Sequence, residues 1–222
     1  MTDNIIPIDL GGVNCYLVRA GDGFILVDTG IAMRRANLEK ALESAGCRPG
    51  NLKLIVITHG DIDHVDNAAY LREKYGAKIA MHAADAGMVE GGDMGAGRKA
   101  KPDKVTPVFG IMMAMMRLFG PRPGQFTRFK PDVYVEDGQD LSEYGCQAKV
   151  LHLPGHSKGS VGVLTAQGGL ICGDLFYNFP GFGLVDDAAA HAASVNRLKA
   201  YPIQTIYPGH GRPCPVGKFV KA

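Results

Sequence analysis

The chain has 222 residues, of which 46% are hydrophobic, and this is enough apolar material for one sizeable α/β domain. Its formal net charge of +2 is too small to indicate a nucleic-acid partner. Five cysteines without a CxxC pair favour reduced thiols, and the first nine residues lack the basic start and the apolar stretch of a signal peptide. We therefore expect a cytoplasmic protein.

Strand and helix signals alternate along the chain. Gly21 and Gly23 are suited to the turn of a hairpin between the first two predicted strands, and residues 54–81 have the pattern of a βαβ crossover. In chain order, we expect strands at 13–19, 24–27, 54–57, 78–81, 149–153, 161–165, 169–172 and 205–207, and helices at 32–45, 65–75 and 187–200. This pattern alone predicts an α/β protein.

Four potential metal ligands lie in the sequence THGDIDH, directly after the apolar run 54–57. They are His59, Asp61, Asp63 and His64. The first three alternate and can converge from one strand-to-helix loop, and the fourth lies in the first turn of the predicted helix. Their nitrogen and oxygen atoms are donors that bind divalent cations at about 2.0–2.2 Å. Surface histidines and helix-capping aspartates are the alternative, but the spacing of all four favours a metal site.

Three later segments each place a ligand-type residue in a glycine-marked loop after an apolar run. They are PGHS, which contains His156, CGD, which contains Asp174, and PGHG, which contains His210. The sequence VDTG also closes the predicted strand 24–27. In this order the motifs resemble the metallo-β-lactamase superfamily, whose usual pattern is HxHxDH followed by His, Asp and His. The resemblance runs from about Gly12 to Gly211 and implies an αββα sandwich in a single domain, 1–222.

By the same resemblance, two divalent cations are implied, at the separation of about 3.5–4 Å that is typical of two-metal hydrolytic sites. The first ion would be held by His59, Asp61 and His156. The second would be held by Asp63, His64 and His210, and Asp174 would bridge both ions. A water or hydroxide between the metals would be the nucleophile, because coordination lowers its pKa. Asp63 and Asp174 are therefore also catalytic candidates.

Asp61 stands where the usual motif has its second histidine. An anionic ligand replaces a neutral one, so three carboxylates would face the two cations, and the pull on the proton of the bridging water would be weaker. The family suggests zinc, whereas the harder ligand set favours iron or manganese. The alternative is that Asp61 turns away from the metals and acts on their ligands from behind.

The stretch at about 87–128 interrupts the alternation and is predicted to be a lid-like insertion over the site. Within it, residues 108–119 form a mostly apolar helix, too short for a bilayer, which needs about 20 residues. One side of this helix is predicted to carry an apolar stripe, made of Phe109, Met112, Met113 and Met116. The stripe could belong to the protein core, form a dimer contact or act as a lid over an acyl group of the substrate. Between positions 91 and 130, eight basic residues against two acidic ones favour an anionic substrate or an anionic membrane surface.

The remaining candidates are single residues. Tyr177, just after Asp174, could donate a hydrogen bond to a developing oxyanion, or it could pack under the insertion. His82, His152 and His191 are expected to be structural or surface residues, and Cys172 is expected to belong to the core.

The resemblance implies a metal-dependent hydrolase that cleaves an ester, lactone, thioester or phosphodiester bond of a small molecule through a metal-bridging hydroxide. True β-lactamase activity is not expected, because those enzymes are typically exported. One alternative, suggested by Asp61, is a di-iron oxidoreductase that needs a separate electron donor. The other is a ligand sensor that binds metal without turnover.

Overall fold

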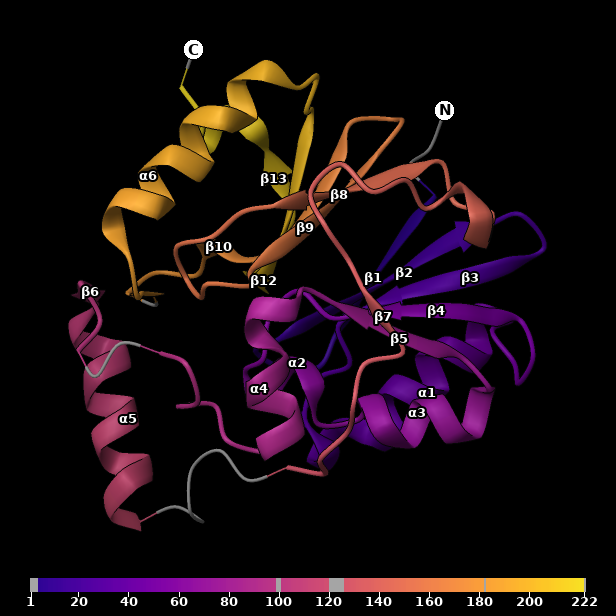
Figure 1. Cartoon of the computed structure of the whole chain (residues 1–222), viewed down its shortest axis with the longest axis horizontal. Helices are drawn as coiled ribbons and strands as arrows, with labels where there is room; N and C mark the ends of the chain where they lie inside the picture. Colours follow the sequence, from indigo (N-terminus) through magenta and orange to yellow (C-terminus); the bar gives the residue numbers. More distant parts are fainter. Residues whose placement is uncertain (1–3, 99–100, 120–125, 182, 222) are drawn as a thin grey trace.

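Two β-sheets lie face to face, with helices on their outer sides, in the computed structural model, which describes residues 4–98, 101–119, 126–181 and 183–221 (Figure 1). The first sheet has the strand order β1 (Ile5–Asp9), β2 (Asn14–Ala20), β3 (Gly23–Val27), β4 (Leu52–Val56), β5 (Lys78–Met81) and β7 (Val133–Tyr134). The second has the order β13 (Cys214–Pro215), β12 (Thr205–Gly211), β10 (Gly169–Asn178), β9 (Val161–Thr165) and β8 (Ala148–His152).

Three apolar clusters account for the layers. The middle cluster joins both sheets, with members such as Val56 of β4 and Val163 of β9, both fully buried. A second cluster lies between the first sheet and helices α1 (Arg35–Ser44) and α3 (Ala68–Tyr75), and a third joins the second sheet to α6 (Ala188–Arg197). Burial of this apolar surface is the main stabilising term of such a sandwich. The layer order confirms the predicted αββα fold.

Several element boundaries differ from the prediction. The helix expected at 65–75 is divided into α2 (Ile62–Val65) and α3, and the Asn67 side chain between them donates to the carbonyl oxygens of Thr29 and Ile31. The helix expected at 32–45 begins with a 3₁₀ turn, Ala32–Arg34. A second 3₁₀ turn, Leu198–Ala200, follows α6.

The positions of Asp174 and His210 require a correction, since both were expected in loops after strands. They lie inside β10 and β12, which pair in parallel as far as Asn178 and Gly211, with register shifts on both sides of Gly173. The glycines that suggested loops therefore mark irregularities within strands, as is usual for a glycine inside a strand.

The predicted insertion contains most of α4 (Ala83–Gly91), the short strand β6 (Lys104–Val105), which pairs with β11 (Leu184–Val185), and α5 (Pro107–Phe119). Helix α5 stands at the left edge of the molecule, apart from both sheets (Figure 1). No helix of the described residues is long and apolar enough to cross a bilayer. The division into one domain with an insertion stays a prediction.

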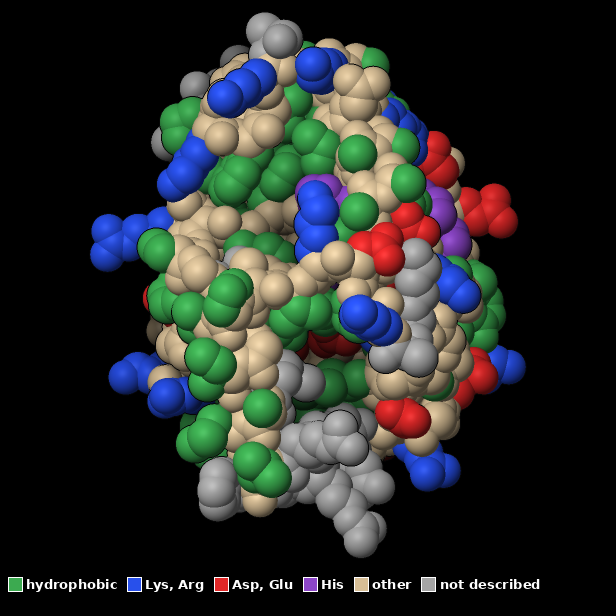
Figure 2. Space-filling model, turned by 90° about the vertical axis from the view of Figure 1, so that its left-hand side faces the viewer, with side chains coloured by type: hydrophobic (Ala, Val, Ile, Leu, Met, Phe, Trp, Pro, Cys, Tyr) green, Lys and Arg blue, Asp and Glu red, His purple; other side chains and the backbone are tan. Residues whose placement is uncertain are grey.

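One face of α5 is exposed and apolar. Its members are Val108, Ile111, Met115 and Leu118, whose exposed fractions are 53%, 66%, 54% and 73%. Figure 2 looks onto this side of the molecule and shows hydrophobic side chains at its surface. Of the stripe predicted from the sequence, Phe109 is half-buried. The other stripe residues, Met112, Met113 and Met116, have side chains outside the described part of the chain, as do Lys99, Arg117 and Arg122. The lid and dimer interpretations stay predictions.

Candidate metal centre

The predicted ligands come together at one end of the sandwich. His59 follows β4, His156 follows β8, and Asp174 and His210 lie within the neighbouring strands β10 and β12. The buried strand β4 is continued by a loop into α2, whose first turns carry Asp63 and His64. Both sheets therefore contribute to the same cluster of side chains.

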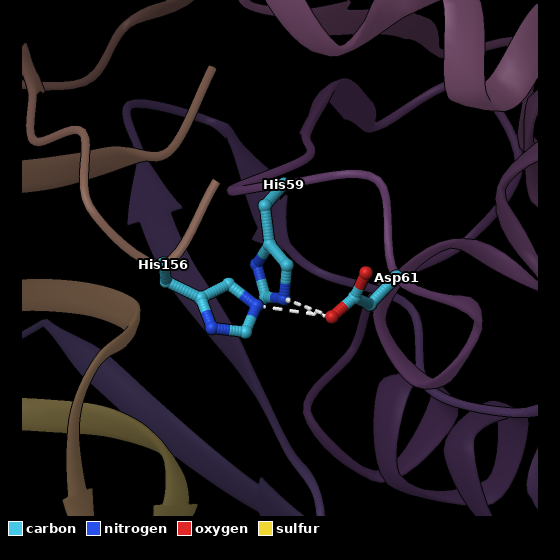
Figure 3. Close-up of side chains that lie close together, drawn as sticks. All are labelled: His59, Asp61 and His156. Carbon is cyan, nitrogen blue, oxygen red and sulfur yellow. Dashed lines mark hydrogen bonds and ion pairs between the residues drawn. The ribbon is translucent and has the colours of Figure 1, made fainter. Parts of the chain in front are cut away.

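The first group consists of His59, Asp61 and His156. Asp61 Oδ2 lies 3.0 Å from His156 Nε2 and 3.6 Å from His59 Nε2, and the three side chains point toward one another (Figure 3). Asp61 thus faces the two histidines and does not turn away from them.

The second group consists of Asp63, His64 and His210. Asp63 Oδ2 lies 3.3 Å from His210 Nε2 and 3.8 Å from His64 Nε2. Asp174 lies between the two groups: its Oδ1 is 3.4 Å from His64 Nε2, and its Oδ2 is 3.3 Å from His210 Nε2 and 3.9 Å from His59 Nε2. Asp174 therefore contacts histidines of both groups.

Each of the four histidines is held at its outer nitrogen by an oxygen atom. Nδ1 of His59 faces Thr58 Oγ1 at 2.9 Å, and Nδ1 of His64 faces Asp28 Oδ2 at 2.8 Å. Nδ1 of His156 faces Leu184 O at 3.0 Å, and Nδ1 of His210 faces Gly12 O at 2.5 Å. Carbonyl and carboxylate oxygens only accept, and the Thr58 hydroxyl already donates to Asp28. Every Nδ1 therefore carries a proton, and every Nε2 is the ring nitrogen left to bind a cation, as in metal-ligating histidines.

The cluster also fits a cation by burial and by shape. His59 and His64 are 1% and 0% exposed, and their Nε2 atoms have no hydrogen-bond partner among the described residues. Buried polar atoms of this kind are costly unless a ligand satisfies them. Gly209 packs so closely on the cluster that a Cβ there would collide with Asp174 Oδ1. Imidazole nitrogens and carboxylates together are donors for divalent metal ions.

Without a cation, protons balance the carboxylates. Burial alone would lower the pKa of His210, but Asp174 and Asp63 outweigh it and raise this pKa to about 10. Burial opposes ionisation of Asp174, yet His210 and His64 hold its pKa well below the usual range. Metal binding would therefore release a proton from His210, as expected for a site whose ligands must be deprotonated.

A family profile agrees with this geometry. The profile described as Metallo-beta-lactamase superfamily matches residues 8–210, which include every ligand candidate. The chain belongs to the metallo-β-lactamase superfamily.

The relatives of this metallo-β-lactamase superfamily member are distant. An uncharacterized protein of Mycobacterium tuberculosis is 28% identical over 160 residues, and the match covers 70% of this chain but only 61% of that protein, less than two thirds of its length. The hydroxyacylglutathione hydrolase GloC of Haemophilus influenzae is 26% identical, with 98% of this chain and 94% of that protein covered. The structure of the FEZ-1 metallo-β-lactamase of Legionella gormanii superposes with a TM-score of 0.71 at 18% identity, and the match covers 94% of this chain and 77% of that one. The two proteins share the fold.

Two residues of this superfamily member that sequence reasoning missed lie directly beside the ligands. Arg98, from the insertion, places Nη2 2.5 Å from Asp61 Oδ1. Burial opposes ionisation of Asp61, but Arg98, His156 and His59 together outweigh it and hold the Asp61 pKa well below its usual range. The second missed residue is Asp85, an acidic residue in the first turn of α4, a helix that was not predicted from the sequence.

Asp85 connects the two loops that carry the first group. It is 2% exposed and accepts hydrogen bonds from Gly60 N at 3.2 Å, Ser157 Oγ at 2.6 Å and Gly159 N at 2.7 Å. Gly60 stands between His59 and Asp61, and Ser157 follows His156. One buried carboxylate thus sets the distance between the ligand loops.

We expect Asp85→Asn to weaken metal binding about 10–100-fold and to lower the free energy of unfolding by about 1–3 kcal/mol, because an amide leaves one of these donors without an acceptor. Zinc titration and urea denaturation measure the two effects. Asp22→Asn, at a side chain that is 91% exposed, is the control. Unchanged metal affinity would show that Asp85 supports only the fold.

The other singled-out side chains lie as follows. Tyr177 Oη is 3.0 Å from His156 Nδ1, and its ring stacks on His210 at a centroid distance of 5.7 Å. His82 and His152 stack on each other at 4.1 Å and belong to none of the ligand groups found among the described residues. His191 Nε2 donates to Leu175 O, and Cys172 is buried.

Proposed function

We propose that this chain is a metal-dependent hydrolase that cleaves an ester, lactone, thioester or phosphodiester bond of a small molecule at a two-metal site. The ligand set is the one expected from the sequence: His59, Asp61, Asp63, His64, His156, Asp174 and His210. Superfamily membership and the hydrolase among the relatives support the class. The observation that carries the proposal is that the Nδ1 atom of each of the four histidines faces an oxygen atom, which turns every Nε2 toward the carboxylates.

Divalent cations at this site would supply Lewis acidity and lower the pKa of water at neutral pH. The protein's part is to hold the donors and to orient the substrate. Asp174 spans both groups and fixes their separation. The Asp63 side chain is 34% exposed, against 15% for Asp61 and 6% for Asp174. Asp63 therefore lies on the open side of the cluster, which is the side from which a substrate can approach.

A thioester is the first substrate class to test, because the Haemophilus influenzae relative is named as a hydroxyacylglutathione hydrolase. The experiment is a turnover screen of thioester, ester, lactone and phosphodiester probes on protein loaded with zinc, manganese or iron. We expect turnover in one class that chelation abolishes and metal restores. Metal-loaded protein without turnover in any class would contradict a hydrolase and favour the sensor.

Tyr177 is proposed to act on the reaction from beside His156, as a donor to the oxygen on which negative charge develops. We expect Tyr177→Phe to lower kcat by about tenfold to a hundredfold while metal content stays constant, since a lost oxyanion donor costs at most about 10²–10³. Steady-state kinetics on the substrate that the turnover screen identifies measure this change in kcat. Unchanged turnover would remove Tyr177 from the catalytic residues.

A di-iron oxidoreductase is the second candidate, and the position of Asp61 among the ligands favours it. An additional carboxylate makes the site harder and more anionic, which suits iron or manganese better than zinc. Two iron equivalents with a redox-active absorption spectrum and no hydrolysis would support this function over the hydrolase.

A further inference from the structure

Arg98 is placed like a constituent of the metal centre, although it comes from the insertion. Its Nη2 lies 2.5 Å from Asp61 Oδ1 and 3.3 Å from His156 Nε2, and its Nη1 lies 3.7 Å from Asp186 Oδ1. The side chains of Arg98, Asp61 and Asp186 are only 13%, 15% and 8% exposed. A guanidinium removed from water to this extent needs carboxylates around it.

The two oxygens of Asp61 have different partners. Oδ2 faces the Nε2 atoms of His59 and His156, and Oδ1 faces Arg98. One carboxylate can therefore offer an oxygen to a cation while the other oxygen keeps its guanidinium. A neutral histidine at position 61, as in the usual superfamily motif, would remove the carboxylate nearest to Arg98 and leave Asp186 at 3.7 Å.

The same contacts attach the insertion to the ligand loop. Arg98 lies between α4 and β6, and Asp186 directly follows β11, the partner strand of β6. Met94 Sδ, in the same stretch as Arg98, accepts from Ile62 N at 3.0 Å, next to Asp61. The segment around Arg98 is thus held against the metal ligands at two points.

We propose that Asp61 and Arg98 form one functional unit: Asp61 provides a metal ligand through Oδ2, and Arg98, a positioning residue, neutralises its extra charge through Oδ1 and fastens the insertion over the centre. The inference rests on the metal site of the proposed function but on no particular reaction. The carboxylate at position 61 and the arginine at position 98 compensate each other's charge, and the arginine suits the site only beside that carboxylate.

This pairing predicts a coupled effect on metal affinity. With Asp61→His, the guanidinium loses its nearest carboxylate and stays beside the cation position, so repulsion weakens metal binding. With Arg98→Met, the site keeps its ligands and loses a cation that Asp61 had already neutralised, so metal binding stays close to the wild-type level. With both changes, the ligand set is that of the usual superfamily motif without the opposing cation, and binding recovers.

The experiment is a double-mutant cycle on metal affinity. Zinc is titrated into the metal-free wild type, Asp61→His, Arg98→Met and the double variant, in competition with a chromophoric chelator. We expect Asp61→His to lose at least about tenfold in affinity and the double variant to regain most of that loss. Additive effects, or a wild type that binds no zinc, would overturn the inference.

A second measurement tests the attachment of the insertion. Arg98→Met is expected to raise amide hydrogen exchange at residues 93–98 several-fold, and the strand β4 is expected to exchange as in the wild type. Arg98→Lys keeps the charge but not the planar guanidinium, and its exchange at residues 93–98 is expected to lie between that of the wild type and that of Arg98→Met. The matched control is Lys104→Met, which removes an exposed charge from the same insertion and is expected to change neither this exchange nor the zinc affinity. Unaltered exchange in Arg98→Met would contradict the attachment.

These measurements need no substrate. A coupled cycle in a protein without hydrolytic turnover would leave the Asp61–Arg98 unit in place and remove only the hydrolase. Turnover accompanied by an additive cycle would do the reverse.

Discussion

Replacing Asp174 with asparagine is expected to abolish turnover, with a loss of at least about a thousandfold in kcat/KM. Asp174 contacts histidines of both ligand groups, so the change removes the shared anionic donor while it keeps the size of the side chain. Loss of several kcal/mol of transition-state stabilisation corresponds to about this factor. Kinetics at saturating metal measure it, and elemental analysis is expected to show fewer bound ions than in the wild type.

The control for this prediction is Asp140→Asn. The Asp140 carboxylate lies beside the second sheet, accepts a hydrogen bond from Ser142 N and belongs to none of the ligand groups among the described residues. It is expected to retain wild-type kinetics. If Asp174→Asn kept full metal content and wild-type turnover, Asp174 would have no part in the centre.

The second large effect is expected at Asp28, which is 1% exposed and binds residues of the cluster on the side away from the carboxylates. Its carboxylate accepts from Thr58 N, from Thr58 Oγ1 and from His64 Nδ1, each at 2.8 Å. Thr58 Oγ1 in turn accepts from His59 Nδ1. Asp28 therefore fixes the tautomers of two histidines, one in each group.

Asp28→Asn is expected to weaken zinc binding by about 10–100-fold, the usual effect of removing such a supporting carboxylate, and to lower the stability of the metal-free protein. Asparagine also tolerates the positive φ of 60° at this position, so the backbone is not the cause. Zinc titration and urea denaturation provide the two numbers. An unchanged zinc affinity would contradict the role assigned to Asp28.

The candidate ligands could be identified in the sequence because each stands in a short motif with its own spacing. His59, Asp61, Asp63 and His64 come from seven consecutive residues, and the structure brings them together with the three later candidates. The αββα fold was likewise predictable, but through the resemblance, since periodicity gives only an alternation of strands and helices. The local geometry of Asp174 and His210 was not, because strand pairing across β10 and β12 overrides the glycine signals.

Residues that act through the ligands gave no such signal. Asp85 has the position of an ordinary acidic residue near a helix start, a place that favours negative charge in any helix. Arg98 lies in a stretch without periodicity, so nothing in its neighbourhood indicates which of the many basic side chains of the insertion reaches Asp61. The exposed face of α5 differs from the stripe predicted from the sequence. Apolar residues cover most of this helix, so its sequence is compatible with more than one apolar face.

The most direct test of the two-metal site is the metal stoichiometry of the purified protein. We would measure it by elemental analysis of protein prepared without added metal, and again after titration of the metal-free protein with zinc, manganese and iron(II). The site described above predicts two equivalents in the wild type and a reduced number in Asp174→Asn. A wild type that binds no metal, or only one equivalent at saturation, would contradict it.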